Sequence, residues 1–256
     1  MKRAWLKLTR LVLLGFLGVA ITNAHAQSPQ NRTDADIEKL VHEYLLKNPE
    51  VIVEALQTLE RRREEQLAAD QQRQIQANAD ILHASDHQIV IGNPEGDVTL
   101  IEFFDYNCGF CRQTLATVEA LIEQDPKIKV ILKEFPVLGP GSQEAARVSI
   151  AASQIAPAKY KDLHTQLLSA QGQVNERIAL ALSANLGIDT DELQSLSQTR
   201  QVEEAIGEVY QLANDLGING TPSFIIGDEL IPGAVDLDVL QQKVSAMREC
   251  GKTTCS

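Results

Sequence analysis

The sequence contains few cysteines, which stabilise small domains through disulfides, and few methionines, which together with cysteines bind soft metals. Its 256 residues include four cysteines, two methionines and one tryptophan, and aromatic residues make up 4%. Four cysteines are too few for a fold held together mainly by disulfides, so a hydrophobic core must stabilise the chain. Copper binding as the main function is disfavoured, because a copper-binding protein is expected to be rich in soft sulfur ligands.

Basic charge is also scarce, and part of it lies at the N-terminus. Four basic residues precede the apolar run 11–21, and Ala24-His25-Ala26 forms a small-x-small cleavage site. We therefore expect residues 1–26 to be a secretory signal peptide, with an uncleaved membrane anchor as the alternative. No other segment approaches the roughly 20 apolar residues of a membrane-spanning helix.

Cleavage would remove four of the 23 basic residues and none of the 35 acidic ones, so the net charge falls from −12 to −16. This acidic balance disfavours nucleic acids and anionic membrane surfaces as partners. The mature chain, residues 27–256, is expected in a compartment where disulfides form.

Residues 27–86 are predicted to be a helical region that serves oligomerisation and linking. Thr33 or Asp34 can cap a first helix, and Asn48-Pro49 ends it and starts a second that runs to about Leu82. Residues 60–79 are charged and rich in glutamine, which predicts a solvated spacer rather than a coiled coil. Apolar residues instead gather ahead of this stretch: Ile37, Leu40, Val41, Leu45, Val51, Ile52, Leu56 and Leu59. Their face needs a partner, which is either another chain, the solution we favour, or the globular domain.

Residues 87–256 are predicted to form an α/β domain. Strands at 88–91, 98–106 and 129–135, with a helix after Cys108, make a β-α-β unit. Beyond Gly139-Pro140-Gly141 the pattern is helical until strands return at 223–227 and 229–231, and a last helix covers 236–247. The domain therefore carries a helical insert at about residues 141–218.

Cys108-Gly-Phe-Cys111 follows the second of these strands directly. A cysteine at a helix N-terminus lies where the helix dipole and free N–H groups favour the thiolate, which is the attacking species in disulfide exchange. The second cysteine, Cys111, is near enough to form a disulfide with Cys108. Half of a zinc site is the alternative, but zinc usually takes four ligands and Cys250 and Cys255 have a different spacing.

Residues 88–247, approximately, resemble the DsbA-type thioredoxin-fold disulfide oxidoreductases of bacterial envelopes. Three features carry the resemblance: the strand ending in Glu-Phe-Phe-x-x-x-Cys-x-x-Cys, the helical insert, and Gly220-Thr-Pro-Ser-Phe224. Residues 44–52 resemble the N-terminal extension of the ScsC-like branch, which serves oligomerisation. The resemblance implies an α/β thioredoxin fold with a helical insertion, preceded by a helical extension. It also implies a periplasmic location and no cofactor. The implied partners are unfolded or misfolded envelope proteins, a DsbD-like or DsbB-like membrane redox partner, and further copies of this chain.

The resemblance also implies roles for individual residues. Cys108 corresponds to the exposed nucleophile and Cys111 to the sheltered resolving thiol. Glu102 corresponds to a buried acid that accepts the proton of Cys111, with a solvent-facing strand residue as the alternative. Thr221 and Pro222 correspond to a cis-proline loop that faces the cysteines and binds extended substrate. For Asp105, we expect a surface or helix-capping role.

The direction of electron flow is predicted from the dipeptide between the cysteines. Gly109-Phe110 lacks the histidine of the strong oxidants in this family, so we expect a milder depression of the Cys108 pKa and a less oxidising disulfide. Arg112 could compensate by turning toward the sulfur, although a solvated side chain is the expectation. An isomerase or reductase is favoured over an oxidase, and an oligomeric chaperone with a secondary redox site is a further alternative.

The remaining candidate ligands carry weaker predictions. Cys250 and Cys255 are expected to close a short structural disulfide, with a second redox pair or a metal clamp as alternatives. The spacing of His83 and His87 would place both on one helix face, but no third ligand is near in the sequence, so we predict no metal site.

Overall fold

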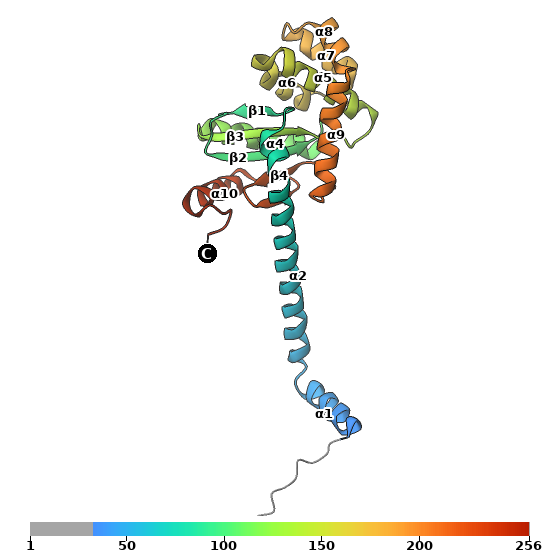
Figure 1. Cartoon of the computed structure of the whole chain (residues 1–256), viewed down its shortest axis with the longest axis vertical. Helices are drawn as coiled ribbons and strands as arrows, with labels where there is room; N and C mark the ends of the chain where they lie inside the picture. Colours follow the sequence, from blue (N-terminus) through green and yellow to red (C-terminus); the bar gives the residue numbers. More distant parts are fainter. Residues whose placement is uncertain (1–32, 256) are drawn as a thin grey trace, which may run out of the picture. The chain divides into compact units, whose positions relative to one another are not determined.

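The structure is a computed structural model that describes residues 33–255 (Figure 1). The expected signal peptide, residues 1–26, lies outside the described residues. The chain divides into an N-terminal unit that ends at Thr58 and a second unit that begins at Leu59.

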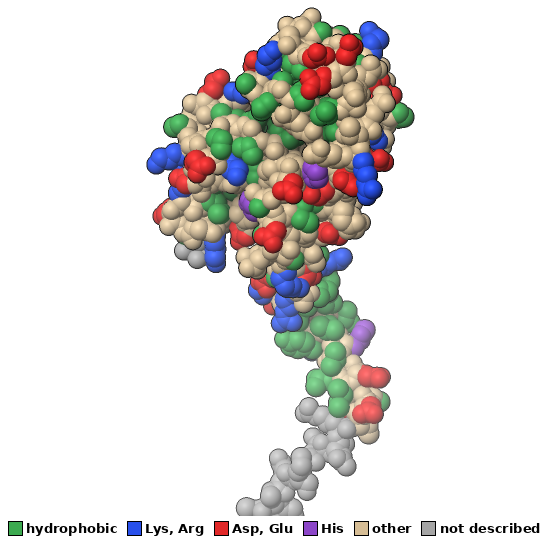
Figure 2. All heavy atoms as spheres, turned by 45° about the horizontal axis from the view of Figure 1, so that its top comes forward, with side chains coloured by type: hydrophobic (Ala, Val, Ile, Leu, Met, Phe, Trp, Pro, Cys, Tyr) green, Lys and Arg blue, Asp and Glu red, His purple; other side chains and the backbone are tan. Residues whose placement is uncertain are grey.

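The N-terminal unit contains helix α1 (Asp34–Lys47) and the start of α2 (Glu50–Ala77). Thr33 caps α1 as predicted, in a capping box: its hydroxyl accepts the N–H of Asp36, and the Asp36 carboxylate accepts the N–H of Thr33. No side chain of α1 is buried. Figure 2 shows hydrophobic side chains gathered on these helices, and many of the apolar residues named above are about half exposed, among them Ile37, Leu40, Val41, Ile52, Leu56 and Leu59.

The second unit is built on a five-stranded sheet with the order β1-β3-β2-β4-β5. Strands β2 and β3 are parallel, and every other pair is antiparallel. The helix α4 (Gly109–Gln124) makes the crossover between β2 and β3. The strands are β1 (Ile89–Gly92), β2 (Val98–Phe104), β3 (Ile128–Glu134), β4 (Ser223–Ile226) and β5 (Glu229–Pro232). Strand β2 ends two residues before the predicted Tyr106.

Alternate residues of β2 enter two hydrophobic clusters on opposite faces of the sheet. Leu100 and Phe104 pack in the cluster that includes residues of α4 and α10 (Leu237–Cys250). Ile101 and Phe103 pack in the cluster that includes residues of α9 (Arg200–Asp215). Both faces of the central strand are therefore covered, which explains its almost continuous apolar sequence.

The globular unit begins earlier in the sequence than the predicted residue 87. Ile75 near the end of α2 and Leu82 of α3 (Ala79–Ala84) are buried in the same cluster as Ile101 and Phe103. The predicted second helix is also broken near Asn78, where α2 ends and α3 begins. Ile75, which lies inside the expected spacer 60–79, is thus a part of the core, and so is Leu82 just after the spacer.

The helical insert lies between β3 and β4, as the periodicity predicted. It contains α5 (Pro140–Ile155), α6 (Pro157–Ser169), α7 (Glu176–Asn185), α8 (Thr190–Ser197) and α9. Helix α8 is short, and Asp189 starts it by accepting the N–H groups of Asp191 and Glu192.

Candidate functional site

The end of β2 and the start of α4 place the two cysteines. Cys108 is the N-cap residue of α4, and its Sγ accepts the N–H of Cys111 at 3.3 Å. The sulfur therefore takes the position that a side-chain oxygen has in an ordinary N-cap. The predicted helix after Cys108 is confirmed.

Cys108 is less exposed than the resemblance implied. Its exposed fraction is 5%, and that of Cys111 is 0%. The reason is the loop before β4: the carbonyl oxygen of Thr221 lies 3.1 Å from the Cys108 sulfur. The Thr221–Pro222 peptide bond in this loop is cis, as the resemblance implied. Thr221 and Pro222 also line a surface hollow of about 260 Å³ beside the end of β5.

The pKa values of the two thiols are shifted in opposite directions. The Cys111 thiol, the Thr221 side chain and backbone N–H groups at the start of α4 favour the Cys108 thiolate and lower its pKa to about 6. The hydrogen bond to Cys108 and burial raise the pKa of Cys111 far above its ordinary value. At neutral pH, Cys108 is therefore mainly a thiolate and Cys111 a protonated thiol.

Glu102 lies within the sheet, and the solvent-facing alternative is wrong. The residue is 2% exposed, and it lies opposite Leu132 of β3 and Phe224 of β4. Within the described part of the chain, its Oε1 has no hydrogen-bond partner. Burial, and secondarily the negative charge of Cys108, raise the pKa of Glu102 to about 8. A Cys108 sulfur held in a disulfide carries no charge, so this second contribution to the raised pKa of Glu102 is then lost.

Asp105 is not the surface or capping acid that we expected. It is 1% exposed, and its carboxylate accepts the N–H of Asn107 at 2.8 Å and the N–H of Leu138 at 2.9 Å. These two bonds join the segment before Cys108 to the loop after β3. The sequence contained no signal for this contact, because Leu138 is 33 residues away.

Arg112 is neither turned toward the sulfur nor free in solvent. Its guanidinium donates to the carbonyl oxygens of Tyr106, at 3.2 and 3.4 Å, and of Gly172, at 2.8 Å. Asn107 was not singled out in the sequence, yet its side chain makes three hydrogen bonds to the helical insert. The only available signal was a polar residue directly before the first cysteine.

A second buried polar cluster lies beneath the same segment and was also missed. The Oε1 of Glu134 accepts from Tyr106 at 3.2 Å and from Tyr160 at 3.3 Å, and Ser149 and His164 bond to the Tyr106 hydroxyl. Burial raises the pKa of Glu134 to about 8 and lowers that of His164 to about 3. Both groups are therefore mainly neutral at pH 7, and the cluster anchors Tyr106 to α5 and α6.

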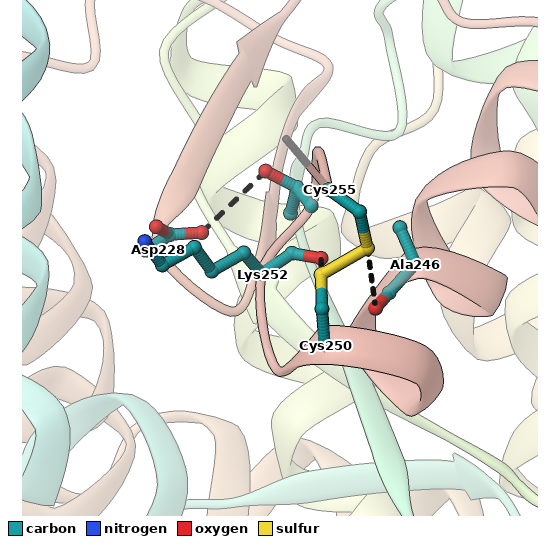
Figure 3. Close-up of a disulfide and its surroundings, with 6 residues drawn as sticks. Asp228, Ala246, Cys250, Lys252 and Cys255 are labelled. Atoms are coloured by element: carbon teal, nitrogen blue, oxygen red, sulfur yellow. Dashed lines mark hydrogen bonds between the residues drawn. A yellow bond between two sulfur atoms is a disulfide. The ribbon is translucent and has the colours of Figure 1, made fainter.

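The C-terminal cysteines form a disulfide at the end of α10 (Figure 3). Its sulfur atoms lie 3.7 Å from the carbonyl oxygen of Lys252 and 3.6 Å from that of Ala246. Thr253 within the closed loop donates to Asp228 in the β4–β5 turn. The disulfide thus closes the short tail loop that was expected, and Thr253 joins this loop to the β4–β5 turn.

The histidine pair does not share a helix face. Helix α3 ends at Ala84, so His83 is helical and His87 is not. Among residues 33–255 there is no group of three or more side chains suited to hold a metal ion. Over the same range, none of the helices combines the length and the apolar character needed to cross a membrane.

Comparisons with known proteins agree on the fold and on both parts of the chain. The DSBA-like thioredoxin domain family matches residues 99–245, more than half of the chain, and the copper resistance protein ScsC N-terminal domain family matches residues 34–66. The chain is 42% identical to a thioredoxin-like oxidoreductase from Silicibacter pomeroyi DSS-3, with a TM-score of 0.64 over 67% of this chain and 98% of that one. It is 26% identical to a linker-deletion variant of Proteus mirabilis ScsC, with a TM-score of 0.67 over 87% and 99%.

Some curated relatives are much longer proteins. The Na(+)/H(+) antiporter NhaA 1 of Salinispora arenicola is 25% identical over 163 residues, which cover 63% of this chain and 25% of that protein. The chain thus spans about a quarter of the length of the first curated relatives that it matches. The domain match and the 42% identical structure nevertheless cover most of the α/β unit described above. The chain belongs to the DSBA-like thioredoxin domain family, with an N-terminal domain of the ScsC type.

Proposed function

We propose that this chain is a periplasmic enzyme that exchanges disulfides in protein substrates, and that it works as an isomerase or reductase rather than as an oxidase. The observation that carries the proposal is the Cys108 sulfur at the N-terminus of α4, activated to a pKa of about 6 and placed 3.1 Å from the Thr221 carbonyl. Cys108, Cys111 and Glu102 are the proposed catalytic residues, and Thr221 and Pro222 the proposed substrate-binding residues.

The exchange starts when the Cys108 thiolate attacks a substrate disulfide. A bond forms between Cys108 and one substrate sulfur, and the other substrate sulfur leaves as a thiolate. In isomerisation, a substrate thiolate attacks the bound substrate sulfur, so that Cys108 is regenerated and no net electrons move. In reduction, Cys111 attacks the Cys108 sulfur and its proton goes to Glu102. The Cys108–Cys111 bond forms, the bond between Cys108 and the substrate breaks, and the second substrate sulfur leaves as a thiolate, so two electrons have passed to the substrate.

Two features support isomerisation over oxidation. Gly109 and Phe110 place no charge between the cysteines, so only uncharged groups favour the thiolate. We therefore propose a reduction potential nearer to the roughly −180 mV of protein disulfide isomerase than to the roughly −120 mV of the strong oxidant DsbA. Measuring the equilibrium of the Cys108/Cys111 pair with glutathione tests this directly.

The second feature is the exposed apolar surface of α1 and the start of α2. We propose that it joins chains into an oligomer, which would hold a misfolded substrate between facing dithiols and keep a bulky membrane oxidase from Cys108. The match of residues 34–66 to the ScsC N-terminal domain supports this role.

Truncation separates the two units. A protein that begins at residue 60 keeps Ile75 and Leu82, which a start at 87 would remove from the core. We expect a folded monomer that retains dithiol activity, loses most isomerase activity on scrambled ribonuclease and becomes a better oxidase. Light scattering that shows a monomeric mature chain, or undiminished isomerisation by the truncated protein, would contradict the proposal.

A chaperone is the second candidate, because the same exposed apolar side chains could bind unfolded chains. The double variant Cys108→Ser, Cys111→Ser distinguishes the two functions. Full recovery of scrambled ribonuclease by this variant would refute the enzyme and support the chaperone.

A further inference from the structure

Both flanks of the dithiol are hydrogen-bonded to one short segment of the helical insert. On the N-terminal side, the Asn107 amide donates to the Val174 carbonyl at 2.9 Å and accepts the Val174 N–H at 2.7 Å. On the C-terminal side, the Arg112 guanidinium donates to the Gly172 carbonyl at 2.8 Å. Residues 172–174 therefore bridge the residue before Cys108 and the residue after Cys111.

The segment is packed closely enough to hold a defined position. It connects α6 to α7, and Val174 is completely buried. Gly141 in the first turn of α5 approaches it so closely that an added Cβ would lie 3.0 Å from the Val174 carbonyl oxygen. The Asn107 amide also donates to Ser142, the next residue of α5, at 3.0 Å. The insert thus contacts the redox site at one place through several independent bonds.

Arg112 lies where it would otherwise influence the nucleophile. It follows Cys108 by four residues, and side chains at this spacing share a helix face, with the later one directed toward the N-terminus. Its charge is nevertheless absent from the groups that lower the Cys108 pKa, which are the Cys111 thiol, Thr221 and backbone N–H groups. The guanidinium is instead engaged by the carbonyls of Tyr106 and Gly172.

We propose that Asn107 and Arg112 are positioning residues: they fasten residues 172–174 beside the dithiol, and this fastening holds the guanidinium away from the Cys108 sulfur. The inference deepens the proposed function, because it assigns control of the dithiol's oxidising strength to a contact with the insert. A released guanidinium would pair with the thiolate, stabilise the reduced protein and make the Cys108–Cys111 disulfide a stronger oxidant.

The test compares Asn107→Ala, Arg112→Gln and the double variant in the full mature protein. The readouts are the Cys108 pKa, from the ultraviolet absorbance of the thiolate, and the equilibrium of the dithiol with glutathione. We expect Asn107→Ala to lower the pKa by about one unit and to shift the equilibrium about tenfold toward the dithiol, which corresponds to about 30 mV for two electrons. Arg112→Gln should leave the pKa near 6, and the double variant should match Arg112→Gln.

The double variant is decisive, because a loss of packing alone would not be reversed by removing a cation. A shift that persists without Arg112, or an Asn107→Ala protein with an unchanged pKa and equilibrium, would overturn the proposal. Ser142→Ala removes one of the bonds that orient the Asn107 amide and should thereby weaken its Val174 contacts, so it should give a smaller shift in the same direction even if Asn107→Ala folds poorly. These readouts need no protein substrate, so a failure to isomerise protein disulfides would count against the proposed function alone.

Discussion

The Cys108 sulfur contacts the Thr221 carbonyl oxygen at 3.1 Å, although the two residues are 113 positions apart in the sequence. The contact places the nucleophile of α4 directly against the loop that leads into β4. An extended substrate that pairs with this loop would bring its own sulfur to Cys108. The exposed fraction of Cys108 is 5%, so we expect small or extended substrates to react faster than folded ones.

Cys111→Ser should trap substrates on Cys108. Without the resolving thiol, a mixed disulfide can be released only by a thiol of the substrate or of the solution, so we expect adducts to accumulate with envelope proteins. Mass spectrometry of the trapped species identifies the cysteine that carries the substrate. Cys250 and Cys255 are paired with each other, and adducts on either of them would refute the assignment of Cys108.

The reactivity of reduced Cys108 should be half-maximal near pH 6. A pKa of about 6 means that about nine-tenths of the thiol is ionised at pH 7, against a few per cent of an ordinary cysteine. Alkylation with iodoacetamide over a pH series measures the midpoint. In Thr221→Val, which lacks the hydroxyl but keeps the β-branched shape, the midpoint should move to higher pH. An unchanged midpoint would show that the Thr221 side chain does not stabilise the thiolate.

Glu102→Gln should alter the pH dependence of stability in the reduced protein. The folded pKa of about 8 exceeds the unfolded value of 4.5, so the native protein loses stability as pH rises from 4.5 to 8. An uncharged amide removes this loss, and we expect the free energy of unfolding of the variant to fall less over this range, by on the order of 4 kcal/mol. Urea unfolding at several pH values measures the difference.

Glu134 titrates in the same direction in both proteins, so its contribution cancels from this comparison. Parallel pH profiles of the two proteins would show that Glu102 ionises as readily in the folded chain as in the unfolded one. The same variant should release mixed disulfides at least about tenfold more slowly, because Cys111 then lacks its proton acceptor.

Leu56→Asp should weaken the proposed association of chains. Leu56 is 54% exposed and belongs to the apolar face of the N-terminal region, so a charge there would be buried unpaired in an interface. Leu67→Asp is the matched control, because Leu67 is 60% exposed on the same helix but lies in the polar half. Light scattering should show a lower mass for Leu56→Asp only. Equal masses for both variants and the parent would contradict the proposed interface.

Local sequence determined most of the elements and the identity of the dithiol. Thr33 caps α1, Cys108 caps α4 and the apolar run 98–104 forms the central strand, and each follows from residues within a few positions of one another. The resemblance added the cis bond at Pro222 and the burial of Glu102. Helix capping and the apolar character of a strand depend on residues close together in the sequence, so the predictions of α1, α4 and β2 required no knowledge of the packing.

Only the tertiary structure decided what the polar residues around the dithiol do. Asp105 and Arg112 have ordinary exposed roles in a local interpretation, yet Asp105 binds the loop after β3 and Arg112 binds a carbonyl of the insert 60 positions away. Ile75 likewise resembles one isolated apolar residue of a spacer, but it covers the sheet. The physical reason is that packing decides which groups lie beside a side chain. The hydrogen-bond partners of Asp105 and Arg112 and the apolar neighbours of Ile75 come from distant parts of the chain.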